Sequence, residues 1–257
     1  MKFNYHTHCK YCGHAVGCCE DYVNEALKSN LETLGFSDHG PFPGDGFGFR
    51  MDYNNLKQYI NEINILKTEY KDKIKLLCGL EIEYISSFDS YYEKLLKNKT
   101  VDYLILGQHY YEDSNNNVHN IYDAESTECF IDYAESSVKG MKTGYFKYLA
   151  HPDLMYENNF KWDENCDKAA DIIIDAAEKY HFILEINANG FRKGLSDMCD
   201  GVRYQYPHDS FWEKVSGRNI DVIIGCDAHD PVQLNDIYNK IAFDYCRKMK
   251  LHLVSLY

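Results

Sequence analysis

The chain is 257 residues long, 45% of them hydrophobic, and its formal net charge at pH 7 is -13. This length suits one large α/β barrel or two small domains, and the hydrophobic fraction is ordinary for a globular protein with a sizeable core. Such an acidic surface repels the phosphate backbone of DNA and RNA, which argues against nucleic-acid binding. It still permits a small anionic substrate, because divalent metal ions reverse the sign of the field inside a pocket.

The ten cysteines are compatible with disulfides, but the start of the chain indicates a cytoplasmic protein with reduced thiols. The first residues lead straight into polar sequence, without the apolar segment of a secretory signal. No stretch approaches the roughly 18–20 apolar residues of a membrane span, so we predict no membrane partner. The sequence leaves the oligomeric state open, including a homo-oligomer.

Short β-like runs alternate with longer helical patterns along the whole chain. The predicted strands are, in order, residues 2–5, 33–36, 74–83, 101–106, 145–150, 182–187 and 221–226. Helical patterns lie between the strands, for example at residues 20–29, 54–70, 126–141, 164–180 and 231–250. The fourth helix carries apolar residues at the spacing of one buried face, namely Ala169, Ile172, Ile173, Ala176, Ala177 and Tyr180. Alternating strands and helices predict an α/β fold with a parallel sheet, as one closed or nearly closed barrel or, alternatively, a doubly wound open sheet.

Side chains that can bind metal ions follow or end almost every predicted strand. They are His6, His8, His39, Glu81, Glu83, His109, His151, Asp227 and His229. In both candidate architectures the active site lies at the carboxyl ends of the strands. We therefore expect these side chains to meet at one face of the sheet.

Two pairs with one intervening residue carry the strongest local signal. His6 and His8 form the first pair, and Asp227 and His229 form the second. Residues i and i+2 of a strand point to the same face, so both members of a pair can bind one ion. A single pair is more often two solvated or core histidines, but two pairs that follow apolar runs make that interpretation less attractive.

Glu81 lies at the end of a strongly apolar run, where a carboxylate is costly unless it is paired or bound to metal. Its two oxygens can bind two ions, so we predict a bridging ligand. Glu83 faces the same way and is interpreted as a partner of a ligand or as a solvated rim residue. Asp38 and Asp153 are candidates for orienting neighbouring imidazoles, with turn or helix-cap roles as the alternative.

Single histidines are more often core groups than ligands. His109 and His151 are therefore candidate ligands only because the other candidates are predicted at the same face. His14 lies in a loop that can fold back over the first pair. Four cysteines gather around it: Cys9, Cys12, Cys18 and Cys19. They are compatible with a structural zinc, but no second Cys-x-x-Cys pair exists, and we assign this cluster no role.

The order of these motifs resembles the PHP family, the polymerase and histidinol phosphatase superfamily. The resemblance covers the whole chain, as one domain over residues 1–257. The resembling pieces are His6-Thr7-His8, His14, Ser37-Asp38-His39-Gly40-Pro41, residues 79–84, His109, His151 and residues 187–192 and 225–229. Residues 38–43 and 79–84 look like the histidinol-phosphatase branch. The family fold is a distorted, TIM-barrel-like (β/α)7 barrel, which agrees with the alternation of strands and helices.

The resemblance implies two to three divalent metal ions, usually zinc, manganese or iron. It implies one ion on His6, His8, Glu81 and Asp227. It implies a second ion on Glu81, His109 and His151, and a third on His14, His39 and His229. Since histidine occupies every position of the third set, we predict a trinuclear site in which Glu81, Asp227 and His229 take part in catalysis.

A site of this kind implies a hydrolase of histidine biosynthesis that converts L-histidinol phosphate and water into L-histidinol and phosphate. Metal ions roughly 3.5–4 Å apart clamp a phosphoryl group, and a hydroxide that bridges them attacks phosphorus in line with the leaving alcohol. Arg192 lies where family members carry an arginine, and we assign it to the substrate phosphate, with a surface salt bridge as the alternative. Arg50, in a glycine-rich loop, is a second candidate.

Other functions stay open at this point. The segment after His151 has no basic residue before Lys161, which leaves a nucleotide or sugar phosphate as an alternative substrate. A barrel that binds metal without turnover is a candidate from another class. An amidohydrolase usually has a lysine where Glu81 stands, and the charge disfavours a polymerase-associated exonuclease. The native metals and the general acid are not determined by the sequence.

Overall fold

The computed structural model describes residues 1–44 and 47–256. The chain forms two compact units. The first unit comprises Met1–Ile82, Phe88–Ile105 and Gly225–Lys240, and the second comprises Glu83–Ser87, Leu106–Ile224 and Ile241–Tyr257. The single domain expected over residues 1–257 therefore stays a prediction.

The first unit contains four neighbouring strands. They are β1 (Phe3–Asn4), β2 (Thr33–Phe36), β3 (Lys75–Ile82) and β4 (Tyr103–Leu106, whose last residue belongs to the second unit), in this hydrogen-bonded order. β1 pairs with β2 and β2 pairs with β3 in parallel, with Phe36 opposite Cys78. Because parallel strands end at the same edge, this register brings His39 and Glu81 together as an isolated bridge.

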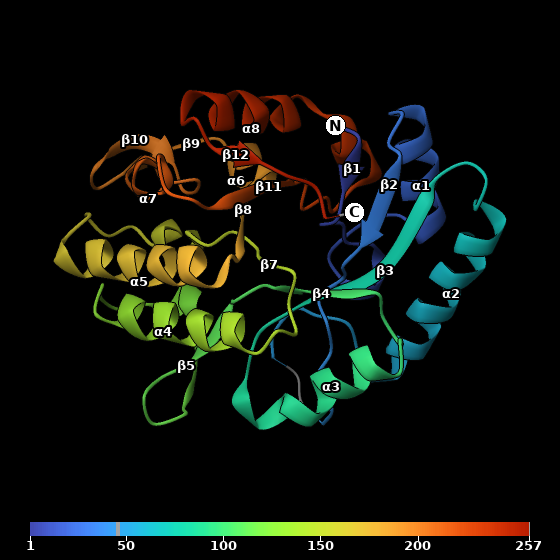
Figure 1. The fold of residues 1–257 in the computed structure, drawn as a ribbon, viewed down its shortest axis with the longest axis horizontal. Coiled ribbons are helices and arrows are strands. Elements are labelled where there is room, and N and C mark those ends of the chain that lie inside the picture. Colours follow the sequence, from blue (N-terminus) through green and yellow to red (C-terminus); the bar gives the residue numbers. More distant parts are fainter. Residues whose placement is uncertain (45–46, 257) are drawn as a thin grey trace. The chain divides into compact units, whose positions relative to one another are not determined.

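Helices cover the strands of the first unit. α1 (Cys19–Lys28) and α2 (Leu56–Glu69) lie beside β2 and β3 (Figure 1). Both helices confirm the predicted positions to within about two residues, the accuracy at which helix ends are usually defined. α3 (Asp89–Lys97) was not predicted. Among the described residues, three 3-10 segments lie wholly within the unit: η1 (Lys10–Cys12), η2 (Tyr53–Asn55) and η6 (Pro231–Asn235).

Tyr103 fills the space that two glycines leave between the strands of the first unit. Its hydroxyl lies 2.7 Å from the Tyr5 carbonyl oxygen and 2.9 Å from that of Phe36. A Cβ atom at Gly79 would lie 2.5 Å from the Tyr103 ring, and one at Gly35 would collide with its hydroxyl. Glycine at these two positions therefore lets β2 and β3 approach the ring, and β3 is the strand that carries Glu81.

Gly79→Ala is expected to destabilise the folded protein by about 1–3 kcal/mol, because overpacking a tight core forces a side chain from its preferred position. The measurement is the urea midpoint of unfolding. Ser90→Ala, at an exposed position of α3, is the control and should leave the midpoint nearly unchanged. Equal midpoints for the two variants would show that the Tyr103 ring yields without cost.

In the second unit the parallel order continues from the end of β4. It runs through β7 (Tyr148–Leu149), β8 (Ile183–Asn187), β11 (Asp221–Gly225) and β12 (His252–Leu253). Leu106 pairs with Leu149 in parallel, and Asp221 pairs with His252. The seven predicted strands are all present, and β12 is an eighth that the sequence analysis did not include.

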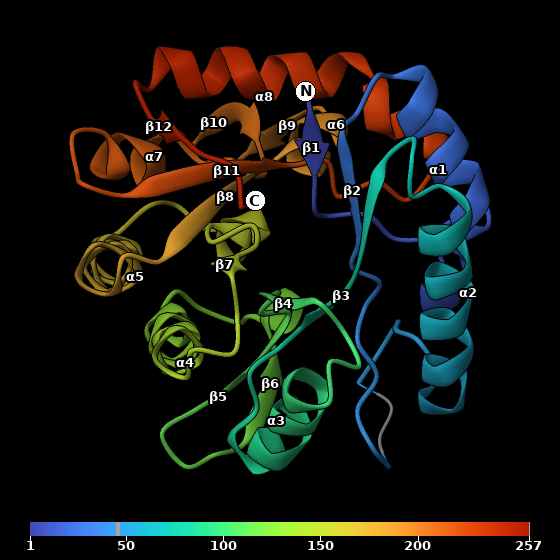
Figure 2. The same ribbon diagram turned by 45° about the vertical axis from the view of Figure 1, so that its right-hand side comes forward.

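The helices of the second unit are α4 (Cys129–Lys142), α5 (Glu164–Tyr180), α6 (Ala188–Arg192) and α7 (Asp209–Val215). α8 (Ile237–Lys248) begins in the first unit and ends in the second. α4 and α5 pack against each other (Figure 2). Among the residues that the structure describes, no helix has the length and apolar character needed to cross a membrane.

The structure confirms α5 residue for residue, but its buried face differs from the predicted one. Asp163 caps the first turn by accepting from two backbone N–H groups, and His181 ends the helix in a left-handed conformation. The buried residues are Cys166, Ala169, Ala170, Ile173, Ile174, Ala176 and Ala177. Ile172 is only half-buried and Tyr180 is exposed, so their inclusion was wrong. The buried stripe includes Cys166, Ala170 and Ile174, so it lies on a face of α5 that is rotated away from Ile172 and Tyr180.

Two antiparallel hairpins interrupt the βα alternation of the second unit. β5 (Tyr110–Glu112) pairs with β6 (Val118–Asn120), and β9 (Leu195–Met198) pairs with β10 (Gly201–Tyr204). Neither hairpin was predicted. Their strands are three or four residues long, too short for an alternating hydrophobic pattern to stand out.

Candidate metal centre

Two histidines and two carboxylates converge after the strands of the first unit. Nε2 of His6 lies 3.3 Å from Oε2 of Glu81 and 3.6 Å from Oδ1 of Asp227. Nε2 of His8 lies 3.3 Å from the same Glu81 oxygen and 3.1 Å from Asp227. All four side chains are buried. Nitrogen and oxygen atoms that face one another in a dry site are the ligand set a divalent cation requires.

A parallel bridge fixes the relative position of the two sequence pairs. Thr7 bridges Ala228, so His6 and His8 lie beside Asp227. Asn4 reinforces the bridge, since its side chain donates to the His6 carbonyl oxygen and accepts from the Cys226 N–H. Asp227 has a left-handed backbone with φ of 45°, a conformation that costs roughly 1–3 kcal/mol outside glycine and that clusters at functional sites.

Burial and charge perturb the protonation of this cluster. Burial lowers the pKa of His8, but the neighbouring Asp227, Asp38 and Cys12 outweigh it, and the pKa lies well above its usual value. Burial raises the pKa of Asp227, yet the positive charge of His6 and the contact with His8 outweigh it and hold the pKa well below its usual range. The carboxylates therefore attract positive charge into the site, which a proton or a metal ion can supply.

The ring of His8 provides a test of whether a metal ion fits. The residue is fully buried, and within residues 1–44 and 47–256 neither ring nitrogen has a hydrogen-bond partner of good geometry. Buried polar atoms normally have partners, and exceptions need an explanation such as an absent ion. Since Nε2 faces both Glu81 and Asp227, a cation at this position fits the residues present.

The three histidines of the proposed third set also lie together in the first unit. Nε2 of His14 is 3.0 Å from Nε2 of His229, and the His14 and His39 ring centroids are 5.2 Å apart. One candidate ligand atom from each residue lies within 4.8 Å of the others. Nδ1 of His39 is also 3.0 Å from Oε2 of Glu81. Burial and the charge of His8 lower the pKa of His229 to about 3, so its imidazole is neutral and can bind a cation.

The second proposed set is divided between the two units. Glu81 belongs to the first unit, whereas His109 and His151 belong to the second, with ring centroids 4.9 Å apart. His109 Nδ1 lies 3.2 Å from Oε1 of the buried Glu83, which supports Glu83 as a partner of a ligand rather than a solvated rim residue. The His151 N–H donates to Glu185, and His151 has a left-handed φ of 30°. A metal ion on this set stays a prediction.

The two aspartates that follow proposed ligands have different partners. Oδ1 of Asp38 lies 3.7 Å from Nδ1 of His8, in keeping with an orienting role. Asp153 instead accepts from the backbone N–H of His208 and from the indole N–H of Trp212. Because His208 is the N-cap of α7, this contact favours the alternative structural role for Asp153. Burial raises the pKa of Asp153 to about 6.

The two candidate phosphate-binding arginines have different surroundings. Arg192 ends α6 in the second unit, where it is half-buried and its Nη1 donates to Oδ1 of Asn189. Arg50 lies in the first unit and donates to the Gly40 carbonyl oxygen while packing over the Phe42 ring. These contacts brace the segment that follows His39. Both assignments to substrate phosphate stay predictions.

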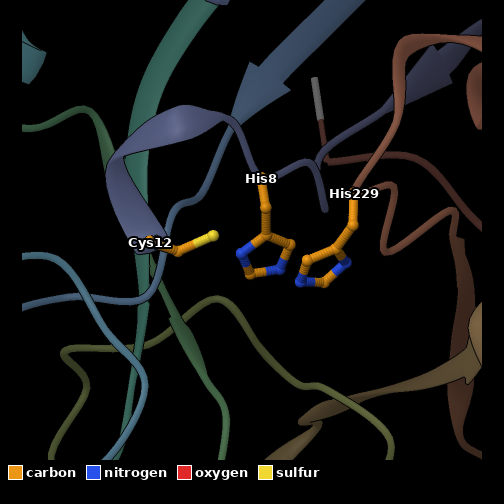
Figure 3. Close-up of side chains that lie close together, drawn as sticks. All are labelled: His8, Cys12 and His229. Atoms are coloured by element: carbon orange, nitrogen blue, oxygen red, sulfur yellow. The ribbon is translucent and has the colours of Figure 1, made fainter. Parts of the chain in front are cut away.

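One cysteine of the N-terminal cluster lies among the candidate ligands. Figure 3 shows the Cys12 sulfur pointing toward the ring of His8, with the His229 ring adjacent. Burial raises the pKa of Cys12, but His14 and His8 outweigh it and the pKa falls below that of an ordinary thiol. The sequence analysis assigned this residue nothing. The signals that could have indicated it were the cysteine cluster around His14 and the spacing Cys12-Gly13-His14.

Buried histidines and carboxylates after parallel strands define a metal-binding α/β protein. The chain belongs to the PHP domain family, whose model matches residues 4–189. This match confirms the resemblance seen in the order of the motifs.

Three known proteins show how far the similarity extends. The chain is 27% identical over 239 residues to the probable histidinol-phosphatase of Deinococcus radiodurans, covering 88% of this chain and 85% of the relative. It is 24% identical over 258 residues to the histidinol-phosphatase of Bacillus subtilis, covering 89% and 94%. In structure it matches the histidinol phosphate phosphatase of Lactococcus lactis, solved with zinc, L-histidinol and phosphate. That match has a TM-score of 0.74 at 21% identity, over 98% of this chain and 95% of that one. It confirms the predicted TIM-barrel-like α/β fold class.

Proposed function

We propose that this chain is a metal-dependent phosphomonoesterase that hydrolyses L-histidinol phosphate to L-histidinol and phosphate. The observation that carries the proposal is the buried convergence of His6, His8, Glu81 and Asp227, with His14, His39 and His229 beside it. The relatives named histidinol-phosphatase support the substrate, as does the neighbour solved with L-histidinol and phosphate.

The ligand types suit two to three divalent ions, with zinc first and manganese or iron as alternatives. Bound divalent ions would supply positive charge for the phosphoryl oxygens and lower the pKa of water. The protein's own part is to hold the ligands rigid and exclude bulk water. Glu81 is central to this, because its Oε2 lies 3.0–3.3 Å from nitrogen atoms of His6, His8 and His39.

Carboxylates next to the ligands would fix which ring nitrogen each histidine presents. Asp38 lies on the Nδ1 side of His8, so Nε2 faces Glu81 and Asp227. Glu83 has the same relation to Nδ1 of His109. Such partners commonly contribute roughly 10–100-fold to metal affinity or activity. Burial and the charge of His8 lower the pKa of His229, which supports a role as a ligand rather than as the proton donor to the leaving alcohol.

A phosphate-release panel with zinc- or manganese-reconstituted protein tests the proposal. The substrates are L-histidinol phosphate, nucleoside monophosphates and sugar phosphates. We expect kcat/KM for histidinol phosphate to exceed the others by about 100-fold or more. Preferential release from a nucleotide or sugar phosphate would keep the phosphatase and replace its substrate. No release from any phosphoester by metal-loaded protein would overturn the proposal.

Arg192→Ala is expected to raise KM for histidinol phosphate by about 10–100-fold, because a hydrogen bond to a charged group is worth roughly 1.5–3 kcal/mol. Arg192→Lys should recover part of the loss, since lysine keeps the charge without the planar fork. The control is Arg247→Ala, at a highly exposed position of α8. An unchanged KM in Arg192→Ala would remove this residue from the phosphate site.

A further inference from the structure

The thiol of Cys12 is held close to the third set of histidines by a tight local structure. Cys12 is the last residue of η1 and is 1% exposed. Gly13 follows with a left-handed φ of 82°, which reverses the chain and returns His14 to the same side. Nδ1 of His14 then lies 3.2 Å from the Cys12 carbonyl oxygen. Cys12 and His14, two residues apart in the sequence, therefore lie next to each other in the structure.

The sulfur of Cys12 lies close to ring nitrogens of two histidines. Its sulfur lies within 4.8 Å of a ring nitrogen of His8 and of one of His229, and these two nitrogens also lie within 4.8 Å of each other. The His8 and His229 rings are stacked with centroids 4.2 Å apart, and the sulfur points toward them (Figure 3). The thiol donates a hydrogen bond of 3.3 Å to the Cys9 carbonyl oxygen, and the lone pairs of the sulfur stay available for an ion.

The other cysteines of the cluster have different roles. The Cys9 thiol donates to Oδ2 of Asp38 at 2.9 Å and lies 3.2 Å from the sulfur of Cys19. Cys18 is the N-cap of α1 and belongs to its capping box with Asp21. Cys12 is thus the one member of this cluster whose sulfur faces histidine nitrogens within the described part of the chain.

The spacing matches what a tetrahedral ion needs. With a metal–sulfur distance of about 2.3 Å and metal–nitrogen distances of about 2.0–2.1 Å, ligand atoms on one zinc ion lie roughly 3.5 Å apart. The ligand atoms of Cys12, His8 and His229 lie within 4.8 Å of one another and would contract toward this spacing when an ion binds. His229 belongs both to this group and to the set of His14, His39 and His229, so the sulfur is available for the tetrahedral position that the three histidines leave open.

We propose that Cys12 supplies a thiolate ligand to the metal ion that His14, His39 and His229 bind. The inference rests on the proposed metal centre and deepens it by naming a fourth donor and a metal preference. On binding, the S–H bond breaks, a sulfur–metal bond forms and the proton passes to solvent. A thiolate among imidazoles favours zinc over manganese or magnesium. With four protein ligands this ion has no open position, so substrate phosphate binds the other ions of the centre.

The experiment uses the full-length protein reconstituted with Co²⁺, which adopts zinc geometries and reports its ligands by absorption. Wild-type protein should show visible d–d bands and a near-ultraviolet charge-transfer band from thiolate to cobalt. Cys12→Ser should lose the charge-transfer band and release one ion to a chelator at least about tenfold more readily. Cys9→Ser, from the same cluster, and the exposed Cys199→Ser are controls that should keep the band.

Each outcome of the cobalt experiment either supports or overturns the thiolate ligand. Wild-type protein with d–d bands but without the charge-transfer band overturns the thiolate ligand and leaves the metal centre intact. A band that persists in Cys12→Ser, or that is lost in Cys9→Ser, also overturns it, because another sulfur is then the donor. Wild-type protein that takes up no Co²⁺ overturns both the proposed metal centre and this inference. If Cys12→Ser fails to fold, Cys12→Ala is the second test, and a band that persists in it overturns the thiolate ligand.

Discussion

Glu81→Gln is expected to lower kcat/KM for histidinol phosphate by at least about 1,000-fold, a loss of roughly 4 kcal/mol of transition-state stabilisation. The substitution preserves the shape of the side chain but removes its negative charge. In the structure one Glu81 oxygen faces nitrogen atoms of His6, His8 and His39. An amide cannot hold a cation among three imidazoles as a carboxylate can. Phosphate release and bound metal, measured on the same sample, should fall together.

The matched control is Glu69→Gln, in the last turn of α2, where the side chain is exposed. It removes the same charge from the same unit and should leave both activity and metal content unchanged. Near-ultraviolet circular dichroism of the two variants would show whether the fold is retained. A Glu81→Gln variant with normal metal content and activity would remove Glu81 from the centre.

Local signals explain which elements the sequence could predict. α5 could be placed residue for residue because both ends are encoded nearby, by the Asp163 cap and by the left-handed His181. β12 could not, because two residues form a strand only through their pairing with β11. The buried face of α5 was misassigned at Tyr180 for a similar reason, since tertiary packing decides which neighbouring stripe is covered.

The candidate ligands were predictable for a topological reason. Parallel strands end at one edge, so histidines and carboxylates after those strands must be neighbours, as the bridge between His39 and Glu81 illustrates. Cys12 lies in a loop, and its position depends on the turn at Gly13 and on contact with His229, which is distant in sequence. The anchoring of Asp153 by Trp212 is also a long-range contact that no local pattern encodes.

Removing the bound metal is expected to lower the melting temperature by roughly 5–10 °C. Free metal at 100 times its Kd stabilises the folded state by about 2.7 kcal/mol, and each kcal/mol corresponds to about 2–4 °C for a chain of this size. The measurement is thermal unfolding after chelation, before and after zinc is restored. Glu81→Gln should show little difference between the two conditions. Equal melting temperatures for metal-free and zinc-loaded wild-type protein would contradict a structured metal centre.

The difference in melting temperature between zinc-loaded and metal-free protein should widen from pH 6 to pH 8, because the pKa of His8 is raised in the metal-free fold. A histidine with a raised folded-state pKa stabilises the fold fully below its unfolded value of 6.5, and this stabilisation is lost as pH rises through the folded value. The lowered pKa of Asp227 adds no slope here, since its stabilisation is lost only below about pH 4. Zinc requires neutral His8, so its binding strengthens as pH rises. Melting temperatures at pH 6, 7 and 8 measure this difference, and a difference that narrows toward pH 8 would show that His8 gives up no proton to the metal.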